Sequence, residues 1–206
     1  MPAFLSDIEI REFRLRLCAE AERQFATCGV DAVSMRSLAK ALGCSPTTPY
    51  RYFKNKGEIL AGVRASILDR VSASLEATQA GQPDAIAWAR AHTKVFVDFA
   101  FNEPNAYRLV FDLYQPDEAT FPEMARANAR SVKVSARYVE RLIAEGHLEG
   151  DPEHMGYLYF AALHGLIVLR MSGRHACTRE QFDRNCRQII RLITQGSRTR
   201  SSKKVP

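Results

Sequence analysis

Apolar side chains recur at helical spacing from the N-terminal region onward. In the first run, four apolar residues repeat at four-residue spacing, namely Phe13, Leu17, Ala21 and Phe25. This interval aligns the side chains on one face, so the pattern predicts a helix over about residues 8–28, which Gly29 ends. From residue 83 onward no strand-like alternation persists, and the chain is predicted to be all-α.

The same spacing continues as a series of further helices. It predicts long helices at about residues 57–79, 83–102, 121–145, 152–171 and 178–194, and a short one starting at Pro104. Asp151 is a good N-cap, and Pro152 suits a first helical position, where no backbone N–H is needed. The helix that follows is apolar on nearly every side, which indicates burial on more than one side.

A basic stretch runs from Val33 to Gly57. It contains no Asp or Glu and five cationic residues, namely Arg36, Lys40, Arg51, Lys54 and Lys56. Ser34 can cap a first short helix, and Gly43 can end it by adopting the left-handed conformation. A second short helix after a tight turn completes a helix-turn-helix, whose second helix enters the major groove of DNA.

Pro49 complicates the start of this second helix. If Ser45 is the cap, Pro49 is the first residue whose N–H should bond within the helix, and it has none. Alternatively, Thr48 is the cap and Pro49 takes the first position. Either start leaves Thr47, Thr48 and Tyr50 at the end of the helix that meets base edges.

Side chains of this basic stretch are candidates for contact with DNA. The predicted set is Ser34, Arg36, Ser45, Thr47, Thr48, Tyr50, Arg51, Tyr52 and Lys56. Hydroxyl groups can bond base edges or phosphate oxygens, and cationic groups pair with phosphate. Lys56 lies at the start of the next long helix, whose free N–H groups add to a phosphate site. The alternatives are capping alone for the threonines, a core position for one tyrosine, and a solvated charge for Arg36 or Lys56.

Composition narrows the class of protein. The formal net charge of +6 suits a polyanionic partner. Five cysteines without a CxxC pair argue against a disulfide framework and for a reducing cytoplasm. We expect no signal peptide, no membrane-spanning segment, no metal site and no cofactor. The sequence lacks GxSxG, HExxH and phosphate-loop motifs, so an enzyme is not expected.

Several segments resemble the DNA-binding domain of TetR/AcrR-family transcriptional regulators. They lie at residues 21–29, 34–39, 43–45 and 50–56 and read AERQFATCG, SMRSLA, GCS and YRYFKNK. Residues 103–111 and 163–166 resemble the C-terminal ligand-binding type named for a Trp-His-Gly signature, with Leu163 in place of the Trp. The resemblance implies an N-terminal three-helix helix-turn-helix domain that a fourth helix joins to a helical ligand-binding and dimerisation domain.

The predicted domains follow from this resemblance and from the breaks in the helical pattern. They are residues 1–57 for DNA binding, 58–81 for the connecting helix, 82–196 for effector binding and dimerisation, and 197–206 for a basic tail expected to be disordered. The last two helices are expected to pair with those of a second copy across a two-fold axis. A monomer with a thick core is the alternative.

We therefore expect a cytoplasmic, ligand-responsive, DNA-binding transcriptional regulator. The leading hypothesis is a repressor released from a palindromic double-stranded operator by a small-molecule effector. The alternatives are an activator of the same fold and a helical interaction module that does not bind DNA. Candidate effector contacts are Trp88, His92, Phe96, Phe101, Tyr107, Phe111 and His164. Each of them can instead be an ordinary core residue.

Overall fold

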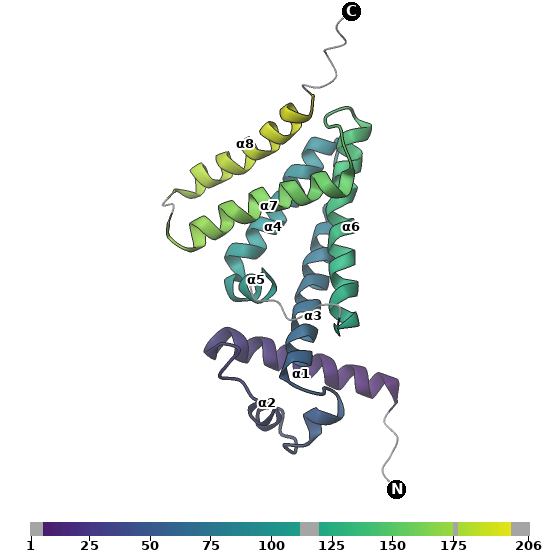
Figure 1. Ribbon diagram of the computed structural model, residues 1–206, viewed down its shortest axis with the longest axis vertical. Coiled ribbons are helices and arrows are strands. Elements are labelled where there is room, and N and C mark those ends of the chain that lie inside the picture. The colour runs from purple at the N-terminus through teal and green to yellow at the C-terminus, as the bar shows by residue number, and fades with distance from the viewer. Residues whose placement is uncertain (1–5, 112–119, 175–176, 199–206) are drawn as a thin grey trace, which may run out of the picture. The chain divides into compact units, whose positions relative to one another are not determined.

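The computed structural model describes residues 6–111, 120–174 and 177–198, with side chains described as far as residue 194. Every regular element in these ranges is helical (Figure 1), which confirms the predicted all-α class. In chain order the elements are α1 (Asp7–Cys28), α2 (Met35–Ala41), the 3₁₀ turn η1 (Thr48–Arg51), α3 (Lys56–Ala77), α4 (Ala85–Asn102), α5 (Pro104–Phe111), α6 (Pro122–Ala144), α7 (Pro152–Met171) and α8 (Arg179–Arg198).

The predicted C-terminal tail differs from the structure at its first residues. α8 runs through Arg198, whereas the tail was predicted to begin at residue 197. The apolar repeat that marked this helix stops at Ile193, so its last polar turns carried no sequence signal. The rest of the predicted tail, residues 199–206, lies outside the described residues.

The chain divides into two compact units, which are described separately. One unit combines residues 1–70 with 103–128, and the other combines 71–102 with 129–206. The first unit holds the predicted helix-turn-helix together with α5 and the start of α6, and the second holds α4, most of α6, α7 and α8. The predicted domain limits divide the chain by function instead, and they stay a prediction.

A small apolar core holds the first unit together. Its buried side chains include Leu17, Ala21, Val33, Leu38, Phe53, Ile59 and Val63. Gly62 lets α1 and α3 approach closely, because a Cβ atom there would lie 3.1 Å from Sγ of Cys18. The capping predictions for α2 are confirmed, since the Ser34 side chain accepts the N–H of Ser37 and Gly43 has φ of +65° just after the helix.

In the second unit α4 packs against three later helices. The His92 and Tyr138 rings lie 4.6 Å apart, Oγ1 of Thr93 lies 2.5 Å from the Tyr159 hydroxyl, and the Phe101 and Phe182 rings lie 5.2 Å apart. The predicted start of α7 is confirmed, because the Asp151 carboxylate accepts the N–H of His154 at 2.8 Å. No helix in the described ranges combines the length and the apolar character needed to cross a membrane.

α7 buries one face within the chain and exposes the opposite one. Tyr159, Leu163 and Ile167 are at most 7% exposed, whereas the exposed fraction of Tyr157 is 65%. Other large apolar side chains that remain exposed on α7 and α8 are Leu158, Val168, Leu169 and Leu192. The single chain therefore leaves uncovered part of the apolar surface that the sequence predicted to be buried.

Candidate DNA-binding interface

The segment after α2 is a short 3₁₀ turn and not the α-helix that the sequence predicts. Its N-cap is Thr47, which makes no side-chain capping bond, so neither predicted cap, Ser45 nor Thr48, is observed. The N–H groups of Thr48 and Tyr50 bond the carbonyls three residues back, at 2.9 and 3.2 Å. Pro49 has no N–H to contribute to an α-helical ladder, and the tighter three-residue pattern results.

Tertiary contacts hold this segment where its own hydrogen bonds are few. Pro49 and Phe53 are fully buried, and Phe53 is 1% exposed. The Tyr52 ring stacks on Phe13 of α1 at 4.2 Å. The segment is therefore fixed by apolar anchors at positions 49, 52 and 53, while the side chains between them are free to face outward.

Arg14 of α1 links this segment to two other elements of the first unit. Its guanidinium donates to the backbone carbonyl of Tyr52 and lies 4.0 Å above the Phe53 ring. It also pairs with Glu123 at the start of α6, at 2.8 Å, and lies 3.7 Å from Glu58 of α3. This role of Arg14 was not predicted from the sequence, because the residue occupies only a polar position beside the apolar face of the first helix.

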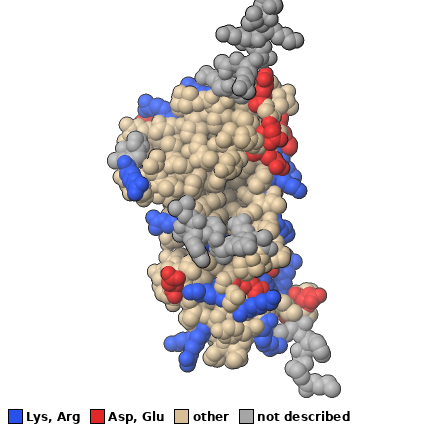
Figure 2. All heavy atoms as spheres, viewed as in Figure 1, with Lys and Arg blue, Asp and Glu red and all other residues tan. Residues whose placement is uncertain are grey.

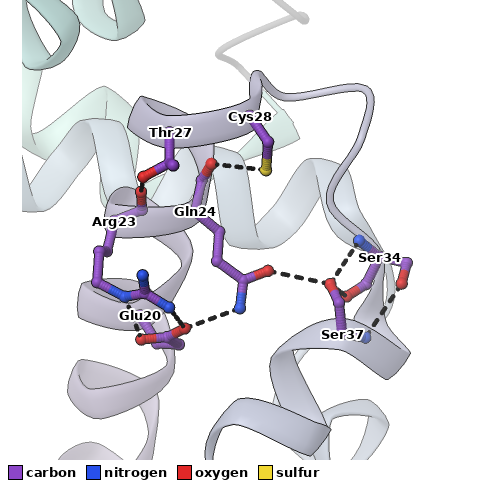
Figure 3. A network of polar contacts seen from close by, with 7 residues as sticks. All are labelled: Glu20, Arg23, Gln24, Thr27, Cys28, Ser34 and Ser37. Carbon is purple, nitrogen blue, oxygen red and sulfur yellow. Dashed lines mark hydrogen bonds and ion pairs between the residues drawn. The ribbon is translucent and has the colours of Figure 1, made fainter.

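A polar network fastens α2 to α1 (Figure 3). Gln24 of α1 donates to the Glu20 carboxylate at 2.7 Å, and its Oε1 lies 3.1 Å from Oγ of Ser37 on α2. Ser37 in turn accepts the N–H of Ser34 at 3.1 Å, completing a capping box. Gln24 is a second residue that sequence analysis missed, since a mid-helix glutamine gives no sign of its partner.

Six of the nine predicted DNA contacts are exposed. They are Ser34, Arg36, Ser45, Thr47, Tyr50 and Arg51. Lys and Arg side chains gather on the part of the visible surface that α1, α2 and η1 form (Figure 2). Exposed cations on this surface are what contact with a phosphate backbone requires.

Three hydroxyls cluster at the start of the 3₁₀ turn. Oγ of Ser45 lies 2.9 Å from Oγ1 of Thr47 and 2.9 Å from Oγ1 of Thr48. Hydroxyl hydrogens rotate, so each group keeps the capacity to donate to or accept from a base edge or a phosphate oxygen. Thr48 is half-buried and Tyr50 is 58% exposed, so Thr47 and Tyr50 are the more accessible of these predicted contacts.

Lys56 is partly engaged inside the protein. Its Nζ atom donates to the carbonyl of Val30, in the loop before α2, at 3.1 Å. The first turn of α3 is capped separately, because Oδ1 of Asn55 accepts the N–H of Glu58 at 2.9 Å. A lysine ammonium has three donors, so this contact orients the side chain and leaves donors for a phosphate. Its role in DNA binding stays a prediction.

Replacing Ser34 separates its capping role from DNA contact. Ser34→Ala should lower the free energy of unfolding by about 1 kcal/mol, because α2 loses its cap. Ser34→Asp should keep the cap and the stability but weaken DNA binding, because it adds a negative charge to an exposed position. Urea unfolding and fluorescence anisotropy with labelled duplex DNA measure the two effects. Unchanged DNA affinity in Ser34→Asp would reduce Ser34 to a capping residue.

Two family models match separate parts of the chain. Residues 17–63 match the model for bacterial regulatory proteins of the tetR family, and residues 89–193 match the model for the tetracycline repressor-like C-terminal domain. The second match alone covers more than half of the 206 residues. The chain belongs to the TetR family. It is therefore a DNA-binding transcriptional regulator and not an enzyme.

Solved structures of TetR-like fold are similar over almost the whole chain. A protein of unknown function from Rhodococcus sp. RHA1 shares 24% sequence identity with a TM-score of 0.75, covering 96% of this chain and 98% of that one. A TetR-family transcriptional regulator from Pectobacterium atrosepticum shares 22% identity with a TM-score of 0.68, covering 97% and 99%. A fatty acid degradation regulator from Bacillus halodurans shares 15% identity with a TM-score of 0.70, covering 90% and 96%. At these identities the similarity shows the fold.

The residues predicted to contact an effector of this TetR-family protein fall into both compact units. Tyr107 and Phe111 lie in the first unit, with their rings 4.8 Å apart. The other five, Trp88, His92, Phe96, Phe101 and His164, lie in the second unit. Whether any of the seven contacts an effector stays a prediction.

Three of the five in the second unit have identifiable surroundings. Nε1 of Trp88 donates to Oγ1 of Thr78 at 3.0 Å, which satisfies the buried indole. Burial lowers the pKa of His92 to about 4, so this ring is neutral at pH 7. His164 is half-buried, stacks on Phe160 at 5.6 Å, and its pKa is also lowered by burial. In the described ranges of this TetR-family chain, no group of three His, Cys, Asp or Glu residues could hold a metal ion.

Proposed function

We propose that the protein is a repressor that leaves a palindromic operator when a small-molecule effector binds its C-terminal domain. The observation that carries the DNA-binding part is the η1 segment, which exposes Thr47, Tyr50 and Arg51 while the buried Pro49 and Phe53 and the stack of Tyr52 on Phe13 hold it in place. Preorganised side chains lose little conformational entropy on binding. Arg36 on α2 is a further exposed cation of the same compact unit.

Removing the two exposed arginines should weaken binding to all duplexes. The double variant Arg36→Gln, Arg51→Gln should lower affinity by about ten- to hundredfold and reduce the slope of log affinity against log salt by about 2, because two phosphate contacts are lost. Fluorescence anisotropy at several salt concentrations measures both quantities, with duplexes chosen by selection from a random pool. Selected sites should be imperfect palindromes with half-sites about 34–36 Å apart or a multiple.

The matched control removes two exposed arginines elsewhere on the chain. Arg108→Gln, Arg137→Gln changes the net charge equally but lies on α5 and α6. The slope of log affinity against log salt of this control variant should equal that of the parent protein within experimental error. An equal loss in both double variants, or a parent protein whose affinity ignores salt, would contradict the proposed interface.

The proposed repressor acts as a homodimer formed through α7 and α8. The uncovered apolar side chains of these helices support this, since Tyr157, Leu169 and Leu192 are 65%, 45% and 59% exposed. Leu169→Glu, Leu192→Glu should shift the protein to a monomer at micromolar concentration in sedimentation experiments. Val132→Glu is the control, because Val132 is 49% exposed on α6. A parent protein that sediments as a monomer would refute the dimer.

The proposed effector site lies in the C-terminal domain, around Phe160, which meets the Phe96 ring edge to face and stacks on the His164 ring. Phe96 and His164 flank Phe160 at 5.8 and 5.6 Å. Aromatic faces with one neutral imidazole suit a ligand that is mainly apolar and carries one hydrogen-bonding group. A compound that releases the operator should bind DNA-free protein as well, and by linkage should bind the DNA complex more weakly by the same factor. If no compound of a broad library releases the DNA, effector control is contradicted.

A further inference from the structure

A groove of about 230 Å³ lies between α4 and α8 in the second compact unit. Its lining residues are Arg90, Thr93, Lys94 and Val97 from α4, and Arg179, Asp183, Cys186, Arg187 and Ile190 from α8. None of the seven residues predicted to contact an effector is among them. The groove is therefore a feature separate from the aromatic site proposed above.

Two of the four cations that line the groove have their charge balanced by neighbouring carboxylates. Lys94 pairs with Asp98 at 2.5 Å, and Arg179 pairs with both Asp98 and Asp183 at 3.0 Å. Arg90 and Arg187 are exposed, and neither forms an ion pair with any residue of the described ranges. The groove therefore holds two cationic groups, one from each helix, that have no ion-pair partner among the described residues.

The floor between these cations is formed mainly by buried apolar side chains, and the Cys186 thiol is only a weak hydrogen-bonding group. Val97 and Cys186 are 2% and 6% exposed. Oγ1 of Thr93 donates to the Ala89 carbonyl at 2.7 Å and accepts from the Tyr159 hydroxyl, so its hydrogen bonds are made within the domain. The groove thus combines an apolar floor with a cationic rim.

We propose that the groove between α4 and α8 binds a small carboxylate with a short apolar body. The carboxylate would accept hydrogen bonds from Arg90 and Arg187, whose planar guanidinium groups match its geometry. The hydrocarbon part would cover Val97, Cys186 and Ile190. The volume is below the range of about 300–1,000 Å³ usual for drug-sized ligands, which favours a single hydrocarbon chain of moderate length. This binding requires neither DNA nor a dimer, so it goes beyond the proposed function.

Titration calorimetry of the full chain with sodium octanoate at low salt tests the proposal. Saturable binding at one site per chain is expected, and it should weaken roughly fourfold for each methylene removed in hexanoate and butyrate. Arg90→Gln, Arg187→Gln should weaken octanoate binding by at least tenfold, because charge-assisted hydrogen bonds are lost. Both residues are exposed, so the variant should fold normally, which circular dichroism checks.

Two controls distinguish binding in this groove from nonspecific electrostatic attraction between a basic protein and an anion. Lys133→Gln, Arg137→Gln removes two exposed cations of α6 and should leave octanoate binding unchanged. Octanol, which is uncharged, should bind at least tenfold more weakly than octanoate. Absence of saturable binding, equal loss in both double variants, or equal affinity for octanol would each overturn the proposal. Because the titration contains no DNA, its failure and the failure of operator binding are distinguishable.

Discussion

Phe53→Ala is expected to lower the free energy of unfolding of the N-terminal unit by about 4 kcal/mol and to abolish specific DNA binding. Phe53 is 1% exposed and lies under the Arg14 guanidinium at 4.0 Å. A Cβ atom on Gly62 would lie 3.4 Å from its ring, so α3 packs closely against it. Removing a fully buried phenyl ring leaves a cavity as well as losing apolar burial, and such changes typically cost about 3–5 kcal/mol.

Urea unfolding followed by far-UV circular dichroism measures this loss, and anisotropy measures DNA binding on the same samples. Phe53→Leu is the matched variant, because it keeps most of the apolar volume and should cost about 1–2 kcal/mol. Its DNA affinity should fall by less than that of Phe53→Ala. A Phe53→Ala variant with parental stability would mean that this ring does not anchor η1.

Lowering the pH from 7 to about 4 should reduce the stability contribution of His92 by about 3 kcal/mol. Burial lowers the pKa of His92 from 6.5 to about 4, since its charged form would lose its hydration beside the Tyr138 ring. In the unfolded chain the imidazole takes up a proton near its ordinary pKa of 6.5. The contribution is therefore fully present above pH 6.5 and is lost progressively as the pH falls toward 4.

His92→Phe isolates this effect from the other titrating groups. The carboxylates contribute to acid unfolding in both proteins, so the difference between the two stability curves reports His92. Urea unfolding at half-unit pH steps should give a constant difference above pH 7 and a relative gain for His92→Phe between pH 6.5 and 4. Parallel curves over this range would show that His92 is protonated as readily in the folded protein as in the unfolded chain.

Helix starts were the part of the fold best predicted from sequence, because their signals are local. Ser34 and Asp151 were identified as caps, and both accept the expected backbone N–H groups. η1 was harder to predict, although Pro49 itself revealed the conflict. The sequence shows that Pro49 lacks a backbone N–H, but it does not show how the segment adapts. Whether the helix starts later or tightens to a 3₁₀ turn depends on how deeply Pro49 and Phe53 are buried.

Contacts between side chains distant in sequence could not be predicted, because they depend on how separate elements pack against each other. The contact from Lys56 to the carbonyl of Val30 spans 26 positions, and the stack of Tyr52 on Phe13 joins two elements whose relative placement no spacing rule gives. The aromatic residues show the same limit. Helical spacing predicts that Trp88 and Tyr107 face a core, but not that they belong to different compact units.

The 3₁₀ form of η1 has a consequence for how this segment exchanges its amide hydrogens. Pro49 interrupts the hydrogen-bond ladder, so η1 has too few internal bonds to persist by itself, and its order depends on Phe53 and Tyr52 staying docked. Deuterium should therefore enter the amides of Tyr52 and Phe53 at rates close to those of the slowest amides in α1 and α3. The η1 segment and the core formed by α1 and α3 would then unfold in one cooperative event, and local unfolding of η1 alone would be rare.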